Sequence, residues 1–264
     1  MNNSSLLHPS KNTFVLIHGA WHGAWCWNKI VPLLESKGHR VIAPDLLGRG
    51  NDNSPTAAVT LSGWVNKIVD IAHEQEGTII LLGHSSGGTV IAQAAEVLGP
   101  KKVAKLIFLD AFMPLNGESV FSLVEKFPTG STGKKNLSLA ESMIFSADQK
   151  TCTLDPVRVH QLLYHDCTDE DVAFAKAMLG AQPLAALATP VEVTEKNYGA
   201  IPKYFILCTD ARDFDKTDIA LNTPCRKIYR LKSSHSPFFS MPDELADVLH
   251  EISEDSDSIT SILT

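Results

Sequence analysis

The sequence predicts an α/β protein in which a mostly parallel central sheet is flanked by helices on both faces. Two observations lead to this fold class. Short runs of β-branched and apolar residues alternate with longer segments of helical periodicity, as crossover connections between parallel strands require. The alternation stops after the strand that ends near Leu109 and resumes near residue 203, so we expect a cap inserted there. With 264 residues, 44% of them hydrophobic, the chain can bury a large core.

The elements before the cap follow from the apolar runs. The expected order is a strand over 13–18 (TFVLIH), a helix over 25–36, a strand over 40–44 (RVIAP), a helix over 61–76, a strand over 78–82 (TIILL), a helix over 86–98 and a strand over 103–109 (VAKLIFL). The strands are short and are bounded by Gly, Pro or Asp. Gly38 is expected to end the first helix, because glycine readily adopts the left-handed conformation that often follows a helix.

The segment over residues 112–197 breaks this pattern. It is rich in Gly, Pro, Ser and Thr, and it is far longer than the roughly 4–6 residues that usually join two elements. We interpret it as a helical cap over one edge of the sheet. Helices are expected near 155–163 and 169–179, with Thr168 or Asp169 as the cap of the second.

The strand and helix pattern then resumes to the end of the chain. We expect a strand over 203–208 (KYFILC), a short helix over 217–222, a strand over 226–231 (RKIYRL) and a last helix over 241–252. Ser240 is the expected cap of that helix and Pro242 an early helical residue. The chain is thus predicted to consist of a core domain, residues 1–111 and 198–264, and a cap, residues 112–197.

Composition and charge argue against several kinds of partner. Lys and Arg number 23 against 30 Asp and Glu, which gives a formal net charge of −7 without a basic patch, so no nucleic acid partner is expected. No stretch resembles a membrane-spanning helix, and the N-terminus lacks the apolar core of a signal peptide, so no membrane association is expected. The five scattered cysteines form no C-x-x-C pair and fit a cytoplasmic location, although plastid import stays open.

The strongest local signal is GHSSGG, residues 83–88, which lies between the strand TIILL and the helix TVIAQAAEVL. It matches G-x-S-x-G, in which two glycines allow a tight strand-to-helix turn that exposes the central serine above the sheet edge. Ser85 is therefore the candidate nucleophile. The N-terminus of the following helix would stabilise negative charge that develops on a substrate oxygen.

A serine hydroxyl needs a base at neutral pH, and His235 is the candidate. It follows the final strand in the sequence SSHSP, at the carboxyl edge where open α/β sheets place their sites and where Ser85 is also expected. The imidazole in turn needs a carboxylate that holds its tautomer and stabilises its cation. The chain order Ser, Asp, His places that acid between the two residues.

Three aspartates at strand ends are candidates for this acid. Asp210 and Asp213 both follow KYFILC. We favour Asp213, because it leaves room for the loop to turn toward His235, whereas Asp210 is close enough to the strand to cap the turn or to pair with Arg212. Asp110 directly follows VAKLIFL on the same edge, and its alternative role is a structural hydrogen bond to the cap.

The loop HGAWHGAW after the first strand is expected to complete an oxyanion hole. Gly19 permits a tight turn there, and the amide of Ala20 could face the oxyanion together with that of Ser86. Gly19, Trp21 and His84 are candidate substrate-binding residues. Packing is the alternative role of Trp21, and a buried, hydrogen-bonded position beside the nucleophile is that of His84.

No metal site is predicted. His18 and His22 have the spacing of metal ligands on a helix, but a strand precedes them and a glycine lies between them. The acidic run DCTDED, residues 166–171, is typical of a helix start and requires no catalytic role.

Taken together, these residues resemble the α/β-hydrolase superfamily, in particular the branch of plant methylesterases, hydroxynitrile lyases and bacterial pyrethroid-hydrolase-type carboxylesterases. The likeness lies in FVLIHGAWHGAWCW, HRVIAPDLLGRG, LLGHSSGG, LIFLDAFMP, YHDCTDEDVAFAKAMLGAQP, IPKYFILCTDARD and SSHSPFFSMPDEL. The resemblance implies an α/β-hydrolase fold, a helical cap that shapes an apolar pocket, and no cofactor. It also implies a triad of Ser85, Asp213 and His235 with backbone donors at Ala20 and Ser86.

Two positions distinguish esterases from lyases within this branch. The similar lyases have Thr or Asn where this chain has Gly19, and the Thr-bearing type has Lys directly after the histidine, where this chain has Ser236. Without that ammonium group nothing evident would stabilise departing cyanide, so both positions are esterase-like. The acid loop TDARDFDK is longer between Thr209 and Asp213 than in the similar esterases, which leaves Asp210 in contention.

We therefore expect a serine hydrolase that cleaves a small to medium carboxylic ester through an acyl-enzyme on Ser85. One alternative is a hydroxynitrile lyase that uses the same triad. Another is a ligand-binding receptor that keeps only the pocket, although Ser85 and His235 would then have no purpose. The expected partner is a small-molecule ester, a homodimer is compatible with the sequence, and no local motif identifies the ester.

Overall fold

The computed structural model describes residues 12–128 and 139–255. Its centre is a six-stranded sheet of order β2-β1-β3-β4-β8-β9 in which every neighbouring pair is parallel. The strands are β1 (Thr13–Ile17), β2 (Arg40–Ile42), β3 (Ile79–His84), β4 (Val103–Leu109), β8 (Lys203–Cys208) and β9 (Lys227–Leu231). The predicted parallel sheet is confirmed, and each of its strands ends within two residues of the predicted position.

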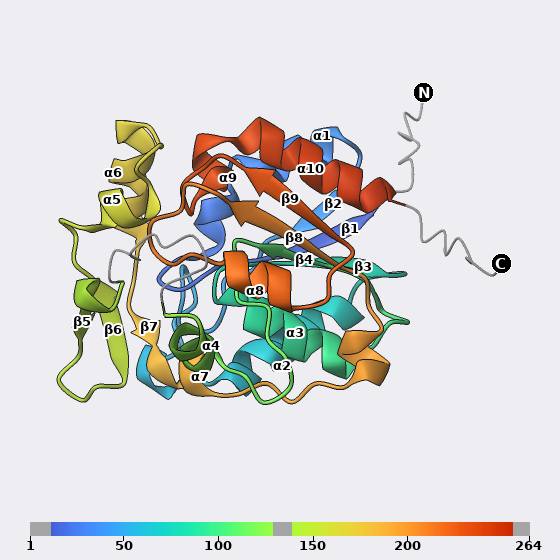
Figure 1. Cartoon of the computed structure of the whole chain (residues 1–264), viewed down its shortest axis with the longest axis horizontal. Helices are drawn as coiled ribbons and strands as arrows, with labels where there is room; N and C mark the ends of the chain where they lie inside the picture. The colour runs from blue at the N-terminus through green and yellow to red at the C-terminus, as the bar shows by residue number, and fades with distance from the viewer. Residues whose placement is uncertain (1–11, 129–138, 256–264) are drawn as a thin grey trace, which may run out of the picture.

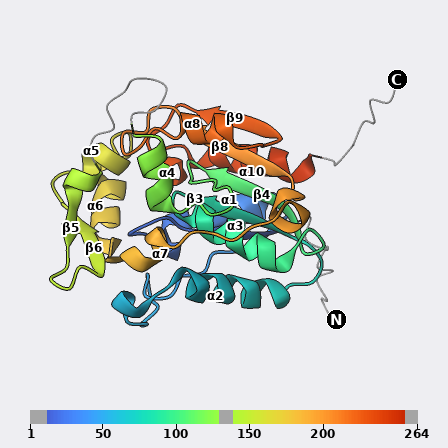
Figure 2. The ribbon, with the colours of Figure 1, turned by 60° about the horizontal axis from the view of Figure 1, so that its bottom comes forward.

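Alternation along the strands builds a separate core on each face of the sheet. In β1, Val15 and Ile17 belong to one core and Phe14 and Leu16 to the other. The first core packs against α2 (Leu61–His73), α3 (Gly87–Leu98) and α8 (Thr217–Asn222), and the second against α1 (Ile30–Ser36) and α10 (Pro242–Glu254) (Figures 1 and 2). Burial of one Leu, Ile or Phe side chain contributes roughly 1.5–3 kcal/mol. The two cores therefore fix the sheet firmly from both sides.

The predicted helix over 25–36 is in fact two short elements. A 3-10 turn covers Ala24–Trp27, and α1 begins only at Ile30. Pro32 explains the break, because proline lacks the N–H of an interior helical hydrogen bond and is tolerated only in a first turn. The preceding turn is held by Asp45, whose Oδ1 accepts a hydrogen bond from the amide of Ala24 at 2.6 Å.

Of the two predicted helix boundaries, the end of α1 at Gly38 is confirmed and the cap of α10 at Ser240 is not. Gly38 follows α1 with a φ of +88°, in agreement with the predicted stop. The predicted Ser240 cap is wrong, because Ser240 is the last residue of a separate short helix, α9 (Pro237–Ser240). The N-cap of α10 is Met241, which makes no side-chain cap hydrogen bond, and Pro242 lies in the first turn as predicted.

Most elements of the segment between β4 and β8 lie toward one end of the sheet, whereas its last turn, Glu195–Gly199, packs against α3 (Figure 1). Its helices are α4 (Val120–Lys126), α5 (Val159–Leu163), α6 (Asp169–Met178), α7 (Leu184–Ala188) and a π-helical turn over Glu195–Gly199. Thr168 caps α6 by accepting a hydrogen bond from the amide of Asp171 at 3.2 Å. Besides the expected helices, this segment contains a three-stranded antiparallel sheet of β5 (Met143–Phe145), β6 (Thr151–Leu154) and β7 (Gln182–Pro183). Residues 129–138 lie outside the described residues, and the division into core and cap stays a prediction.

The described residues contain neither a membrane-spanning helix nor a disulfide bond. Within the two described ranges, no helix has both the length and the apolar character needed to cross a bilayer. The five cysteines carry free thiols, and Cys26, Cys152 and Cys208 are buried. No disulfide therefore contributes to the described fold.

Candidate active site

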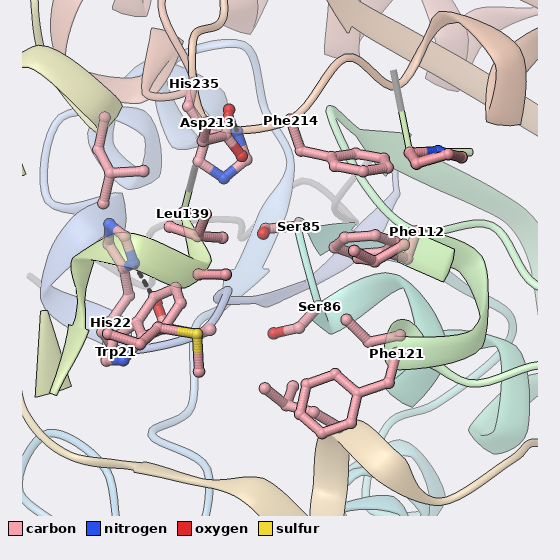
Figure 3. A pocket seen from close by; sticks show the side chains of 18 residues that line it. Trp21, His22, Ser85, Ser86, Phe112, Phe121, Leu139, Asp213, Phe214 and His235 are labelled. Carbon is pink, nitrogen blue, oxygen red and sulfur yellow. Dashed lines mark hydrogen bonds and ion pairs between the residues drawn. The ribbon is translucent and has the colours of Figure 1, made fainter. Parts of the chain in front are cut away.

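Ser85 lies on the sharp turn between β3 and α3. Its φ of +53° is in the left-handed region, which costs a residue with a side chain roughly 1–3 kcal/mol. Its amide donates to Leu109 O at 3.2 Å and its carbonyl accepts from Phe112 N at 3.0 Å, so the turn is held against the end of β4. A side chain at Gly83 would not fit, because its Cβ would lie 2.6 Å from Gly87 O. The turn presents the Ser85 hydroxyl to a cavity at the carboxyl edge of the sheet (Figure 3).

His235 reaches the same cavity from the loop between β9 and α9. Its carbonyl accepts a hydrogen bond from His84 Nε2 at 2.9 Å, and the amide of Ser234 donates to Asp166 Oδ2 at 2.7 Å. The loop is thus anchored both to β3 and to the segment between α5 and α6. Ser85 Oγ makes no hydrogen bond within the described residues. Catalytic hydrogen bonds of this kind often tighten only when substrate binds.

The hydrogen bond behind the imidazole goes to Asp110. His235 Nδ1 lies 2.6 Å from Asp110 Oδ2 but 3.5 Å from Asp213 Oδ1, which is beyond a good hydrogen bond. Asp110 is the residue directly after β4, and its Oδ1 accepts from the amide of Cys208 at 3.3 Å. The geometry therefore favours Asp110 over the expected Asp213 as the partner of His235, although both carboxylates lie close to the ring.

Asp210, the other expected candidate, is engaged through its backbone. Its amide donates to Ser233 O at 3.1 Å, and its carbonyl accepts from His165 Nε2 at 2.9 Å. Its carboxylate forms no hydrogen bond or ion pair with His235 in the described part of the chain, and it does not line the cavity. Asp210 therefore lies in the turn directly after β8, where its backbone makes these hydrogen bonds.

Lys216 completes the site, although no motif in the sequence marks it as a site residue. Its fully buried ammonium group lies 2.8 Å from Asp213 Oδ2 and 3.2 Å from Asp110 Oδ2. Burial opposes its charge, but Asp110 and Asp213 outweigh that effect and raise the pKa of Lys216. Burial likewise opposes ionisation of Asp213, but His235 and Lys216 lower its pKa overall. Asp110, Asp213 and His235 could together hold a metal ion by spacing alone, yet the lysine ammonium already lies between the two carboxylates.

The two expected oxyanion donors lie at the same cavity. Ala20 and Ser86 both line it, and neither amide makes a hydrogen bond within the residues that the structure describes. Ser86 is also the N-cap of α3, so the positive end of that helix points toward the space above Ser85. The arrangement can stabilise a negatively charged oxygen bound next to Ser85.

Of the three expected substrate-binding residues, only Trp21 lines the cavity. Its amide donates to Gln182 Oε1 at 3.1 Å and its Nε1 donates to Cys152 O at 3.2 Å, so the ring is held against β6 and β7. Gly19 and His84 are not lining residues, because they lie behind the nucleophile. A Cβ at Gly19 would lie 2.7 Å from Ser85 Cβ and 2.8 Å from His84 Nδ1.

The histidines of the first loop are buried and hydrogen-bonded within the protein. His18 Nε2 accepts from the amide of Leu46 at 3.2 Å. His22 lies 2.7 Å from Ala20 O through Nδ1 and 2.6 Å from Tyr164 Oη through Nε2. Burial lowers the pKa of His18 to about 4 and that of His22 to about 3, so both rings are neutral near pH 7.

The cavity above Ser85 has a volume of about 340 Å³ and a mainly apolar wall. Figure 3 shows aromatic rings on one side of it, from Phe112 and Phe214 in the core and from Phe121 on α4. Other apolar side chains come from the segment between β4 and β8, namely Val120, Val124, Leu139, Met143, Leu163 and Leu187. No Lys or Arg is among the described lining residues. The cavity suits an uncharged, largely apolar molecule.

Comparisons with known proteins agree with this architecture. A family model described as the alpha/beta hydrolase family matches residues 14–248. Putative methylesterase 11, chloroplastic, of Arabidopsis thaliana is 32% identical over 91% of this chain and 64% of its own length, so the chain spans less than two thirds of that relative. Alpha-hydroxynitrile lyase of Arabidopsis thaliana is 30% identical over 93% of this chain and 98% of that protein. The solved structure of a pyrethroid hydrolase from Sphingobium faniae JZ-2 has a TM-score of 0.82 at 27% identity, and covers 92% of this chain and 97% of that one. The chain therefore belongs to the alpha/beta hydrolase family.

Proposed function

We propose that this chain is a serine hydrolase of carboxylic esters that acts through an acyl-enzyme on Ser85. The observation that supports this most is the 2.6 Å hydrogen bond between His235 Nδ1 and the buried Asp110 carboxylate. A neutral imidazole that donates from Nδ1 has an unprotonated Nε2, which is the atom that must accept the Ser85 proton. The similarity to a methylesterase and to a pyrethroid hydrolase supports an ester as the substrate.

The proposed reaction begins when His235 Nε2 takes the proton of Ser85 Oγ as that oxygen attacks the ester carbonyl. The amides of Ala20 and Ser86 stabilise the oxyanion, and Asp110 stabilises the imidazolium. The imidazolium then protonates the departing alcohol, and the acyl group stays on Ser85. Finally, His235 deprotonates a water molecule that attacks the acyl-enzyme, and the carboxylic acid is released.

The cavity narrows the class of ester. A volume of about 340 Å³ accommodates a small to medium molecule, and the lining residues that the structure describes include no Lys or Arg that would pair with a substrate carboxylate. We therefore propose an uncharged ester with a largely apolar acyl or alcohol part. The aromatic rings of Phe112, Phe121 and Phe214 would pack against that part.

A lyase is the second candidate, because the chain is similar to alpha-hydroxynitrile lyase over nearly its full length. Two features weigh against it. Gly19 has no room for the Thr or Asn of the similar lyases unless Ser85 or His84 shifts. Ser236 stands where the Thr-bearing type has lysine, and Lys216, which shares the Asp110 carboxylate with His235, is already paired with two carboxylates. We therefore favour hydrolysis.

Hydrolysis of p-nitrophenyl acetate and butyrate by purified protein tests the proposal. The Ser85→Ala variant should lose at least about 1,000-fold in kcat/KM, because no nucleophile remains. Ser36→Ala, a substitution of an exposed serine at the end of α1, is the matched control and should keep full activity. Full activity of a folded Ser85→Ala variant would refute the proposal. Cleavage of mandelonitrile without ester hydrolysis would favour the lyase instead.

A further inference from the structure

Behind His235 lie three charged side chains that are almost entirely buried. The exposed fractions are 0% for Asp110 and Lys216 and 4% for Asp213. Lys216 Nζ donates to Asp213 Oδ2 at 2.8 Å, to Asp110 Oδ2 at 3.2 Å and to Phe214 O at 3.1 Å. A triad requires only one carboxylate behind its imidazole. The second carboxylate and the lysine therefore need an explanation of their own.

The two carboxylates differ in what holds them. Asp110 accepts from three donors: His235 Nδ1 at 2.6 Å, Lys216 Nζ at 3.2 Å and Cys208 N at 3.3 Å. Asp213 accepts from Lys216, and its Oδ1 has no hydrogen-bond partner among the described residues. A buried carboxylate with one oxygen unsatisfied is tolerated only beside a cation. Lys216 is that cation.

Apart from these three charged side chains, the ionisable groups near the His235 ring are either uncharged or contact the backbone of its loop and not the ring. The His84 ring on β3 lies near the His235 ring, at 4.4 Å between centroids. The other ionisable groups near the ring are His22 after β1, Asp110 after β4, Cys208 on β8, and Asp213 and Lys216 before α8. Asp166 accepts a hydrogen bond from the backbone amide of Ser234, next to His235. Burial lowers the pKa values of His84 and His22 and raises that of Cys208, so these three are uncharged near pH 7. Asp110, Asp213 and Lys216 are thus the charged side chains packed behind the imidazole.

We propose that Lys216 is a positioning residue that cancels the charge of Asp213, so that His235 faces one net negative charge, supplied by Asp110. This rests on the proposed function of Ser85 and His235. Two carboxylates (−2) and one ammonium (+1) leave −1, which the imidazolium formed during the reaction brings to zero. With both carboxylates and no lysine, the imidazole would stay protonated to higher pH and would be a poorer base. Lys216 also bridges the two acids and fixes Asp110 against Nδ1.

Substitutions in this cluster should move the pKa of His235 in opposite directions. Lys216→Met leaves two carboxylates and should raise that pKa by about one unit or more. Asp213→Asn leaves Asp110 and Lys216, which cancel each other, and should lower it by a similar amount. The double variant Asp213→Asn/Lys216→Met restores a single negative charge and should return the pKa close to its original value.

The pKa of His235 can be measured by NMR titration of its ring resonances in the Ser85→Ala background, so the result does not depend on turnover. The same substitutions in protein that retains Ser85 should displace the acid limb of the kcat/KM profile in the same directions. Lys203→Met is the matched control. Lys203 is also a buried lysine, but its ammonium binds the carbonyls of Tyr198, Gly199 and Ile201 at the opposite end of β8, so the pKa of His235 should not change.

Opposite shifts in the single variants and their reversal in the double variant would support the proposal. A double variant that behaves like Lys216→Met, or single variants without a shift, would overturn it. If Lys216→Met does not fold, Asp213→Asn decides, because only a downward shift agrees with the charge assignment. Failure of the proposed function is separate: it would appear as ester hydrolysis that survives Ser85→Ala, whatever the titration shows.

Discussion

The end of β4 and the loop after β8 both present an aspartate to His235, but they hold it differently. Asp110 directly follows the last residue of β4, and its amide donates to Ile206 O on β8 at 2.7 Å. Asp213 lies five residues beyond the end of β8, and Lys216 holds its carboxylate. An acid built into the sheet can fix the orientation of a ring, whereas an acid on a loop stays buried only with a counterion. Both acids lie between Ser85 and His235 in the chain, so position at a strand end, and not chain order, identifies the orienting acid.

The largest expected effect separates these two acids. Asp110→Asn should lower kcat/KM by about 1,000- to 10,000-fold, because an amide cannot stabilise the imidazolium and favours the wrong tautomer. Asp213→Asn should lower it by about tenfold or less near neutral pH, because the hydrogen bond to Nδ1 remains. Both variants are to be compared with p-nitrophenyl butyrate after circular dichroism has confirmed folding. A larger loss in Asp213→Asn would reverse the assignment.

The second prediction concerns Gly19, which lies just after β1 and packs tightly against Ser85. Gly19→Ala would bring Cβ to 2.7 Å from Ser85 Cβ, so the loop that carries the Ala20 amide must move. Loss of one oxyanion donor typically lowers kcat by about 100- to 1,000-fold, and we expect the lower end of that range. Gly63→Ala on α2 is the control, since its Cβ would meet only side chains, at 3.2 Å and 3.4 Å. Equal activity of the two variants would contradict the oxyanion assignment.

Substitutions in the apolar wall of the cavity should change KM, whereas substitutions at the carboxyl edge of the sheet should change kcat. Phe121→Ala on α4 removes apolar surface that contacts substrate but no group that takes part in bond making. We expect KM for an aryl ester to rise by about tenfold while kcat changes little, because the lost packing acts equally on the bound ester and on the transition state. Steady-state kinetics with phenyl and methyl esters measure this. A fall in kcat alone would place Phe121 closer to the chemistry than we propose.

The smallest effect concerns stability and pH. The folded-state pKa of Asp213 is lowered, so its ionised form stabilises the fold above the unfolded-chain pKa of about 3.9, and this contribution is lost as the pH falls through the folded-state pKa. The difference in Tm between the original protein and Asp213→Asn should therefore shrink from neutral to acidic pH. Each unit of pKa shift is worth about 1.4 kcal/mol. Calorimetry at both pH values checks this, and a constant difference would argue against an ionised Asp213.

The sequence predicted the elements whose signals are local. The central strands β1, β3, β4 and β8 are buried on both faces and form nearly continuous apolar runs, and Ser85 is marked by the glycines of its turn. Ser85 and His235 line one cavity, as expected of residues at the carboxyl edge of the sheet, and their roles stay predictions. The short strands β5, β6 and β7 were not predicted, because two to four residues are too few to show the periodicity of a strand.

The sequence did not predict that Lys216 belongs to the site, nor that Asp110 is a better partner for His235 than Asp213. A lysine within DFDK is typical of a solvated, charged loop, and only the fold shows that it is buried between two carboxylates. Asp110 did carry a usable signal, because it directly follows a strand as Ser85 does. The expected room for the loop to turn toward His235 favoured Asp213, but the distances to His235 Nδ1 favour Asp110.

Covalent labelling tests the central claim most directly. A fluorophosphonate reacts with a serine only when a neighbouring base activates it and donors receive the oxyanion. Peptide mass spectrometry of the labelled protein should find one adduct, on Ser85, and its formation should slow strongly in His235→Ala. An adduct on another residue, or ester hydrolysis that continues at full rate in protein with no adduct on Ser85, would contradict the account.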